Sequence, residues 1–229
     1  MEIKVLGTGG SGDYTKGTSS AVVKREDKTF LIDCGSTVYA QLRTHNMAEE
    51  IDYILITHLH GDHVGCLFQY IYYVGAVHKK LTTFIYSSDA FKQSIIDFLD
   101  MQEVPNEYYD FVHIDDIEGL DYIDTTGMHT KQIPGHSYYF TDENELMYYS
   151  GDIGNTDVAT EFLNTRTEEK ITVFHEINAR DLESHVYYKD AMEKLSDYTA
   201  YGYHCDKATM PEDNTFPLVE DYPELNYGF

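Results

Sequence analysis

The chain has no tryptophan among its 229 residues, and it holds only three cysteines and five prolines. Cys34, Cys66 and Cys205 form no CxxC pair and leave an odd number, so we expect free thiols rather than a disulfide framework. Free thiols are typical of the cytoplasm. No apolar run approaches the ~20 residues of a membrane-spanning helix, and residues 1–5 enter a strand without a signal-peptide pattern. We therefore expect a cytoplasmic protein with no membrane partner.

Basic residues are also scarce. The chain has 16 lysines and arginines against 40 acidic residues, which gives a formal net charge of −24. A protein that holds a nucleic-acid backbone needs clustered cations to neutralise the phosphates. Here the adjacent basic pairs are Lys24-Arg25 and Lys79-Lys80 alone. This composition argues against long nucleic acids as partners.

The hydrophobic pattern alternates between the periods of strands and of helices, without repeats or a linker. Strands are expected over 3–6, 20–23, 29–32, 54–56, 83–86, 111–114 and 171–174, with a hairpin over 137–150 and a last strand ending at 203–204. Helices are expected over 66–77, after a cap at Ser88, and over 187–198. The pattern predicts an α/β protein of two sheets covered by helices. Residues 207–229 form an acidic, aromatic tail that we expect to pack on the domain or on a partner subunit.

The stretch His58-Leu59-His60-Gly61-Asp62-His63 places three imidazoles and a carboxylate directly after an apolar run. In an extended segment His58 and His60 point to the same side, so both can bind one divalent ion. Asp62 and His63 follow the bend at Gly61 and can reach a second ion. The spacing therefore predicts a dinuclear metal site, because such clusters of imidazole and carboxylate are typical metal ligands.

Further ligands are expected where strands meet loops, the usual position of functional residues. His136 lies in a turn between two expected strands, Asp152 follows a strand, and His204 ends the last one. We take these three as ligand candidates. No informative spacing distinguishes the remaining histidines, which we interpret as structural or surface residues: His45, His78, His113, His129 and His175.

The HxHxDH motif at residues 58–63 resembles the signature of the metallo-β-lactamase superfamily. Within that superfamily the chain is similar to the RNase Z-like phosphodiesterase branch. The likeness is carried by segments 6–10, 18–20, 30–35 and 56–63, and then by His175-Glu176, His185 and His204 in that order. It extends to about residue 206. The resemblance implies that residues 1–206 form a catalytic domain with the αββα metallo-β-lactamase sandwich of two mixed sheets flanked by helices.

The resemblance also implies two divalent metal ions, zinc by default with manganese or iron as alternatives. The implied ligands are His58, His60 and His136 for one ion and Asp62, His63 and His204 for the other, with Asp152 as the bridge. His185 would protonate the leaving group or stabilise its charge, and Glu176 would fix the tautomer of His185. Asp62 would serve catalysis as well as metal binding.

One departure from the RNase Z pattern concerns the basic, glycine-rich arm that clamps tRNA in that endonuclease. Here a single hairpin separates His136 from Asp152, so the arm is missing between them. The chain is more similar to compact phage-type (anti-Pycsar) cyclic nucleotide phosphodiesterases. This implies a small nucleotide substrate, with hydrolysis of 3′,5′-cyclic nucleotides to linear monophosphates, and action in the host cytoplasm if the chain is phage-encoded. We also expect a homodimer.

Three alternatives remain open: a tRNA 3′-processing endonuclease whose clamp comes from a partner subunit, a lactonase or other hydrolase of the superfamily, and a metal-binding protein without turnover. The cations expected to rim the site are Lys16, Arg180 and Lys207. We interpret each as a solvated charge, with contact to a substrate phosphate as the alternative.

Overall fold

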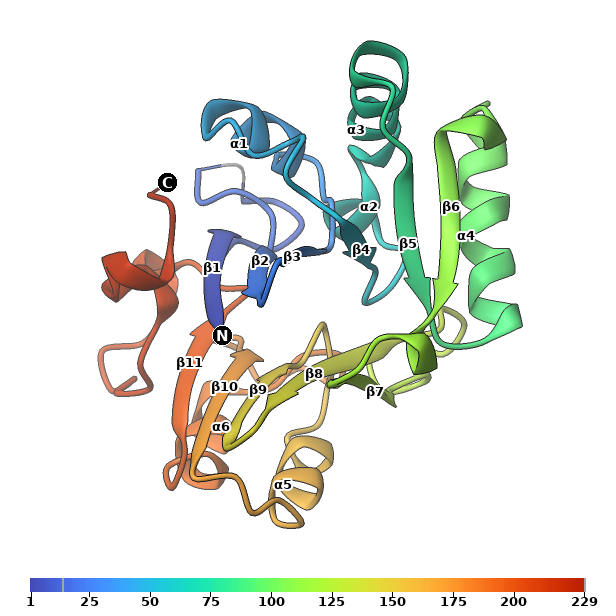
Figure 1. Ribbon diagram of the computed structural model, residues 1–229. Coiled ribbons are helices and arrows are strands. Elements are labelled where there is room, and N and C mark those ends of the chain that lie inside the picture. The colour runs from blue at the N-terminus through green and yellow to red at the C-terminus, as the bar shows by residue number, and fades with distance from the viewer. Residues whose placement is uncertain (14, 229) are drawn as a thin grey trace.

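The computed structural model describes residues 1–13 and 15–228, and Phe229, the last residue of the expected tail, lies outside this range. Two β-sheets pack face to face, with helices on both outer sides (Figure 1). The predicted architecture of two mixed sheets flanked by helices is confirmed. The first sheet has the order β1-β2-β3-β4-β5-β6. Its strands are β1 Glu2–Gly7, β2 Ser20–Arg25, β3 Lys28–Ile32, β4 Tyr53–Leu55, β5 Thr82–Tyr86 and β6 Tyr109–His113.

The second sheet has the order β11-β10-β9-β8-β7 and lies below the first in Figure 1. Its strands are β7 Leu120–Asp124, β8 His136–Asp142, β9 Glu145–Tyr149, β10 Lys170–Glu176 and β11 Thr199–Tyr203. The expected hairpin over 137–150 is the antiparallel pair β8 and β9. Strands β9, β10 and β11 are parallel to one another, so their carboxyl ends, and the start of β8, meet at one edge of the sheet.

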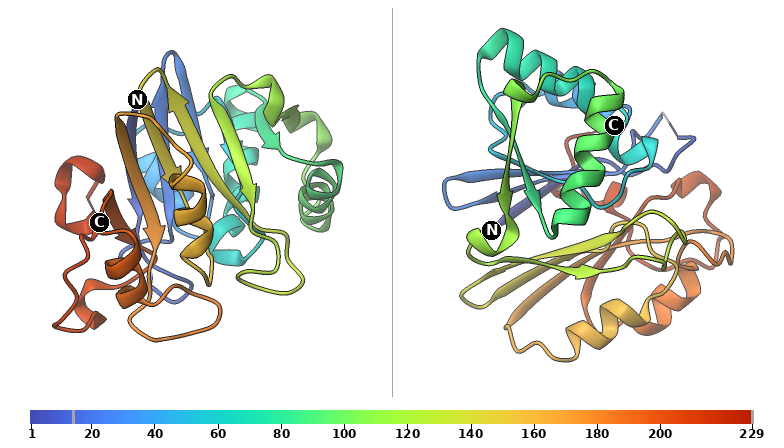
Figure 2. Two further views of the ribbon diagram at one scale, coloured as in Figure 1. Left: turned by 90° about the horizontal axis from the view of Figure 1, so that it is seen from below. Right: turned by 90° about the vertical axis from the view of Figure 1, so that its right-hand side faces the viewer.

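The helices lie on the outer faces of the two sheets, as two perpendicular views show (Figure 2). Those over the first sheet are α1 Val38–Thr44, α2 Gly61–Val64, α3 Leu67–Tyr72 with the π-helical η1 Tyr73–Val77, and α4 Asp89–Met101. Those under the second sheet are α5 Asp157–Leu163 and α6 Tyr188–Lys194. Short 3₁₀ turns are η2 Asn106–Tyr108, η3 Ile114–Asp116, η4 Lys207–Thr209, η5 Val219–Asp221 and η6 Pro223–Leu225. Within the described residues, no helix has the length and apolarity needed to cross a membrane.

Three apolar clusters hold the layers together: one between the helices and the first sheet, one between the sheets, and one under the second sheet. Helix α4 illustrates how the sequence specifies this packing. Ser88 caps it, because its Oγ accepts a hydrogen bond from the backbone N of Phe91 at 3.2 Å. Phe91, Ile95 and Leu99 are spaced along one face and are buried.

The expected helix over 66–77 is divided into α3 and the π-helical η1, and the side chain of Val77 is 63% exposed rather than buried. Gly75 accounts for the close packing of this segment. A Cβ atom at Gly75 would lie 2.6 Å from Cγ of Tyr108, so only glycine lets the two segments approach so closely.

The C-terminal tail lies against strands from both sheets. Leu218 forms a bridge with Gly202 of β11, and Asn226 forms one with Val5 of β1. Phe216 and Val219 are buried in the apolar clusters. The tail thus spans the gap between the first strand of one sheet and the last strand of the other.

Candidate metal centre

The histidine motif runs from the end of β4 into α2, and Asp33 fixes its backbone. The buried carboxylate of Asp33 accepts hydrogen bonds from the backbone N and the Oγ1 of Thr57, both at 2.7 Å, and lies 2.7 Å from Nδ1 of His63. Nδ1 of His63 therefore donates, which leaves Nε2 to face the centre. Asp33 has a φ of 62°, a left-handed conformation that non-glycine residues rarely adopt and that is typical of functional sites.

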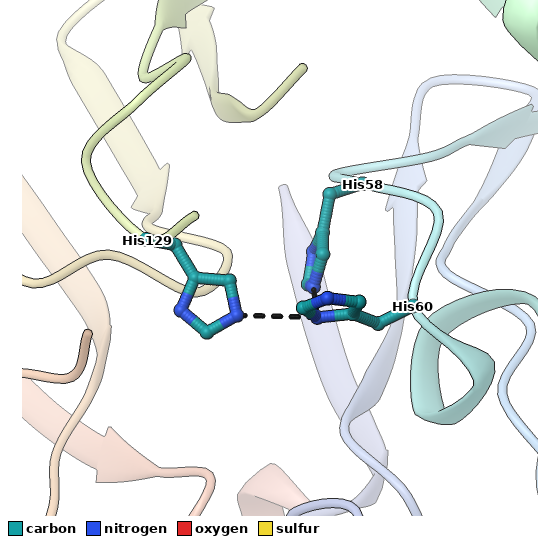
Figure 3. A group of neighbouring side chains, drawn as sticks. All are labelled: His58, His60 and His129. Atoms are coloured by element: carbon teal, nitrogen blue, oxygen red, sulfur yellow. Dashed lines mark hydrogen bonds between the residues drawn. The ribbon is translucent and has the colours of Figure 1, made fainter. Parts of the chain in front are cut away.

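His58, His60 and His129 form what we name the three-histidine group (Figure 3). His60 Nδ1 lies 2.9 Å from His58 Nε2 and 3.2 Å from His129 Nε2. Nδ1 of His129 donates to the backbone O of Ser184 at 2.7 Å, so its Nε2 carries the lone pair that faces the group. Burial lowers the pKa of all three rings, which favours the neutral, metal-binding form.

Asp62, His63, Asp152 and His204 form the His/Asp group, in which all four residues are buried. His204 Nε2 lies 3.4 Å from Asp62 Oδ2 and 3.2 Å from Asp152 Oδ2, and His63 Nε2 lies 3.4 Å from Asp152 Oδ1. Burial disfavours the charged form of Asp62, but the hydrogen bond with His204 and the charge of His63 together lower its pKa to about 2. Asp62 is thus an ionised ligand candidate.

Asp152 lies between the two groups. Besides its contacts in the His/Asp group, its Oδ2 is 3.9 Å from Nε2 of His58 and 3.8 Å from Nε2 of His129. Burial opposes ionisation, yet the surrounding rings of His204 and His63 hold the pKa of Asp152 well below its usual range. One carboxylate therefore faces imidazoles of both groups.

The donor atoms fit divalent metal ions. His63 Nε2 and Asp152 Oδ1 are buried and have no hydrogen-bond partner among the described residues, whereas buried polar atoms normally have one. In the three-histidine group, neutral ring nitrogens lie within hydrogen-bond distance of one another. Imidazole and carboxylate ligands in this combination suit zinc, manganese and iron.

Glu176 and His185 form a hydrogen-bonded pair beside these groups. Nδ1 of His185 lies 3.1 Å from Oε2 of Glu176, and Oε1 of Glu176 accepts from the backbone N of Ile153 at 3.0 Å and of Val186 at 3.3 Å. The His185 ring centroid is 4.7 Å from that of His129 and 5.1 Å from that of His204. Because Nδ1 is bound to a fixed carboxylate, Nε2 is the nitrogen of His185 left for a substrate.

These groups open into a cavity of about 790 Å³. Its walls come from the glycine-rich loop after β1, the histidine motif, the loop between β10 and α6, and the start of the tail. The lining residues are Gly10, Ser11, Gly12, Asp13, His60, Gly61, Asp62, His129, Asp152, Asn178, Ala179, Arg180, Leu182, His185, His204, Cys205, Asp206, Thr209, Met210 and Pro211. This volume is in the range of small-molecule sites.

The structure does not bring His136 into either group, in contrast to the ligand set expected from the sequence. His136 is the first residue of β8, and its Nε2 lies 2.8 Å from Oγ of Ser87. Its ring packs against Phe91 and Tyr122. The strand direction is the reason: His136, Tyr138 and Phe140 alternate along β8 and are all buried, so the ring points toward the core. His129 stands in its place beside His58 and His60.

His129 and Asp33 contact the candidate ligands, and neither is among the site residues expected from the sequence. His129 lies in the irregular loop between β7 and β8, where no periodicity indicates which way a side chain points. The strand that follows could have excluded His136 as a ligand. There His136 alternates with Tyr138 and Phe140, a pattern that indicates a core-facing side chain. Nothing in the spacing distinguishes Asp33 from other acids, since its role depends on a left-handed backbone.

The sequence matches a known protein family. The sequence profile of the family described as "Anti-Pycsar protein Apyc1" matches residues 1–204. An anti-Pycsar protein Apyc1 of Paenibacillus sp. (strain J14) is 46% identical over 68 residues, which are 29% of this chain and 28% of that relative. A ribonuclease Z of Metallosphaera sedula is 29% identical over 122 residues, which are 52% of this chain and 42% of that relative. The matched segments thus span less than half of each relative.

Solved structures share the fold across nearly the whole chain. The metallo-β-lactamase fold protein YhfI of Bacillus subtilis superposes with a TM-score of 0.71 and 16% identity, covering 99% of this chain and 93% of that one. Human tRNase Z, short form, superposes with a TM-score of 0.65 and 18% identity, covering 92% of this chain and 95% of that one. The chain therefore has the metallo-β-lactamase fold with a His/Asp cluster of the kind that metal-dependent hydrolases use, and it belongs to the anti-Pycsar protein Apyc1 family.

Proposed function

We propose that this protein is a dinuclear-metal phosphodiesterase that hydrolyses 3′,5′-cyclic nucleotides to linear monophosphates. The observation that carries the proposal is the position of Asp152. Its carboxylate faces His58 and His129 on one side and His63 and His204 on the other, as expected for a ligand shared by two ions. The family match adds support, since the name of that family refers to the Pycsar system.

The chemistry divides between the metals and the protein. Two divalent ions, when bound, neutralise charge on the phosphodiester oxygens and lower the pKa of an attacking water. The bond from phosphorus to the ribose oxygen breaks as the bond to the water oxygen forms. The leaving oxygen needs a proton, and Nε2 of His185 is the group that supplies it, since Nδ1 is held by Glu176. Glu176 thus acts as a positioning residue for His185.

Electrostatics favours a small substrate over RNA. The chain has a net charge of −24 and no run of basic residues that would release the counterions of a tRNA. The acids Asp13 and Asp206 also line the cavity and would repel a polyanion. A cyclic mononucleotide carries one negative charge, so it avoids most of this repulsion.

A substrate panel tests the proposal. Purified protein loaded with zinc or with manganese is offered cyclic mononucleotides, small esters, a lactone and a precursor tRNA. We expect linear monophosphate from the cyclic nucleotides and weak binding of tRNA at physiological salt. Cleavage of precursor tRNA without turnover of any cyclic nucleotide would favour the endonuclease, and turnover of the lactone alone would favour a lactonase.

Two variants separate the roles of the site residues. Asp152→Ala should abolish hydrolysis and reduce the content of about two ions per chain, measured by elemental analysis, because it removes a shared ligand. His185→Ala should keep both ions and lower kcat by about 100-fold or more, the usual contribution of a positioned proton donor. An aryl phosphodiester whose leaving group needs no proton serves as the control. Equal losses on both substrates would contradict the assignment of His185 as proton donor.

A further inference from the structure

Most cationic side chains in the described part of the chain already have an acidic or carbonyl partner. This includes two of the three cations that the sequence places at the rim of the site. Nζ of Lys16 lies 2.7 Å from Oε2 of Glu220, and Lys207 pairs with Asp221. Lys16 therefore ties the C-terminal tail to the loop after β1, Lys207 pairs with an acid inside the tail, and neither lysine is free for a ligand.

Arg180 differs from both lysines. Its guanidinium has no hydrogen bond or ion pair within the residues that the structure describes, and it lines the cavity of the metal centre. Among the residues that line this cavity there is no other lysine or arginine. Arg180 is therefore the permanent positive charge in a cavity whose other cationic groups are titratable imidazoles.

The loop between β10 and α6 presents Arg180 together with His185. Asn178 closes this loop, because its backbone N donates to the O of Val186 at 2.7 Å and its Oδ1 accepts from the backbone N of Arg180 at 2.9 Å. Leu182 and His185 pair across the loop in an antiparallel bridge. The anchored loop therefore presents the guanidinium and the proton-donor imidazole to the same cavity.

The acids that line the same cavity do not neutralise Arg180. Asp13 and Asp206 both line the cavity and carry negative charge. Their carboxylates are engaged by backbone groups, since Oδ1 of Asp13 accepts from the N of Thr15 at 2.9 Å and Oδ1 of Asp206 accepts from the N of Ala208 at 2.8 Å. Neither acid is paired with Arg180, so the charge of the guanidinium is available to an anionic substrate.

We propose that Arg180 is a specificity-determining residue that binds the negatively charged phosphodiester of the substrate, an inference that rests on the proposed function. A guanidinium presents a planar pair of N–H donors that matches two phosphate oxygens, which a lysine cannot match. In this role Arg180 selects anionic diesters over uncharged esters, while the metal centre and His185 carry out hydrolysis.

Kinetics and binding of Arg180→Gln and Arg180→Lys test the proposal. Arg180→Gln should raise KM for a cyclic nucleotide and for bis(p-nitrophenyl) phosphate by about 10-fold or more, with kcat changed by less than about threefold. Arg180→Lys should recover part of the loss. An uncharged p-nitrophenyl ester should show no change. A titration with a hydrolysis-resistant cyclic phosphorothioate should give the same weakening of Kd, independent of turnover.

Lys131→Gln is the matched control, because Lys131 has no partner among the described residues and lies outside the cavity lining. It removes the same charge and should leave KM unchanged. Equal effects of Arg180→Gln and Lys131→Gln, or an equal effect on the uncharged ester, would overturn the proposal. If the wild-type protein binds the phosphorothioate but hydrolyses only bis(p-nitrophenyl) phosphate, the proposed function fails while the role of Arg180 is still tested on that diester.

Discussion

His129 lies in the loop that leads into β8 and His136 is the first residue of that strand, yet their rings have different surroundings. His129 Nε2 faces His60 at 3.2 Å, whereas His136 Nε2 faces Ser87 at 2.8 Å. We predict that His129→Gln lowers the metal content by about one ion per chain and that His136→Gln retains both ions. His136→Gln should instead lower the free energy of unfolding by about 1–3 kcal/mol, because a flexible amide cannot reproduce the packing of the ring against Phe91 and Tyr122. Elemental analysis and urea unfolding distinguish the two. Loss of metal from His136→Gln alone would restore the ligand set expected from the sequence.

His175 makes the stability depend on pH. Burial lowers the pKa of its ring to about 4, and its Nδ1 donates to the backbone O of Glu176 at 2.8 Å. Below pH ~6.5 the unfolded chain binds a proton at this ring while the folded chain does not, so stability falls as the pH falls from ~6.5 to about 4. The loss reaches about 3 kcal/mol at most. His175→Asn, which keeps an N–H donor, should reduce the slope of urea-derived stability against pH over this window. An unchanged slope would refute the prediction.

Three loops pack closely together at Gly154, namely the loops that hold Gly154, Met128 and Glu183. Gly154, in the loop after β9, donates its N–H to the O of Met128 at 2.8 Å. A Cβ atom at Gly154 would lie 2.1 Å from the O of Glu183 and 2.8 Å from the O of Met128. Glu183 and Met128 neighbour His185 and His129 in their loops. The absence of a side chain at Gly154 therefore lets the loops of both histidines approach.

Gly154→Ala should consequently displace both loops. We predict a lower metal content and a lower kcat together, since His129 and His185 move with the same contact. Gly61→Ala is the control, because Gly61 lies within the histidine motif and a Cβ there meets nothing within 4 Å. The control should keep its metal content. The loops would be independent if Gly154→Ala reduced activity at full metal content.

The elements and the site differ in how far the sequence predicts them. Alternating apolar residues predict the strands, and the Ser88 cap predicts α4, because these depend on local periodicity. Asp152 and His204 could be proposed as ligands from the sequence because each comes shortly after an expected strand. His129 was not, because it lies in an irregular loop whose path depends on contacts with Ser184 and Gly154 from distant parts of the chain.

At the scale of the whole molecule, the candidate metal centre is built from residues of both sheets. His58, His60, Asp62 and His63 follow a strand of the first sheet, and His129, Asp152 and His204 lie in loops that follow strands of the second. Bound metal should therefore stabilise the packing of the sheets. At a free concentration of 100 times Kd, one ion contributes about 2.7 kcal/mol. We predict that a chelator, which removes both proposed ions, lowers Tm by about 10–20 °C and that zinc restores it, measured by calorimetry. A Tm insensitive to the chelator would contradict this linkage.

The path of the tail has a consequence for self-association. β1 and β11 end their sheets, and a terminal strand with free N–H and C=O groups can recruit a strand from another molecule. The tail occupies both positions, through Asn226 at Val5 and Leu218 at Gly202. Removal of residues 207–229 would uncover two recruiting strands and the apolar surface beneath Val219. Light scattering should show that the shortened chain forms concentration-dependent aggregates. In the full chain, the tail would then prevent the addition of strands from other molecules to the two sheets.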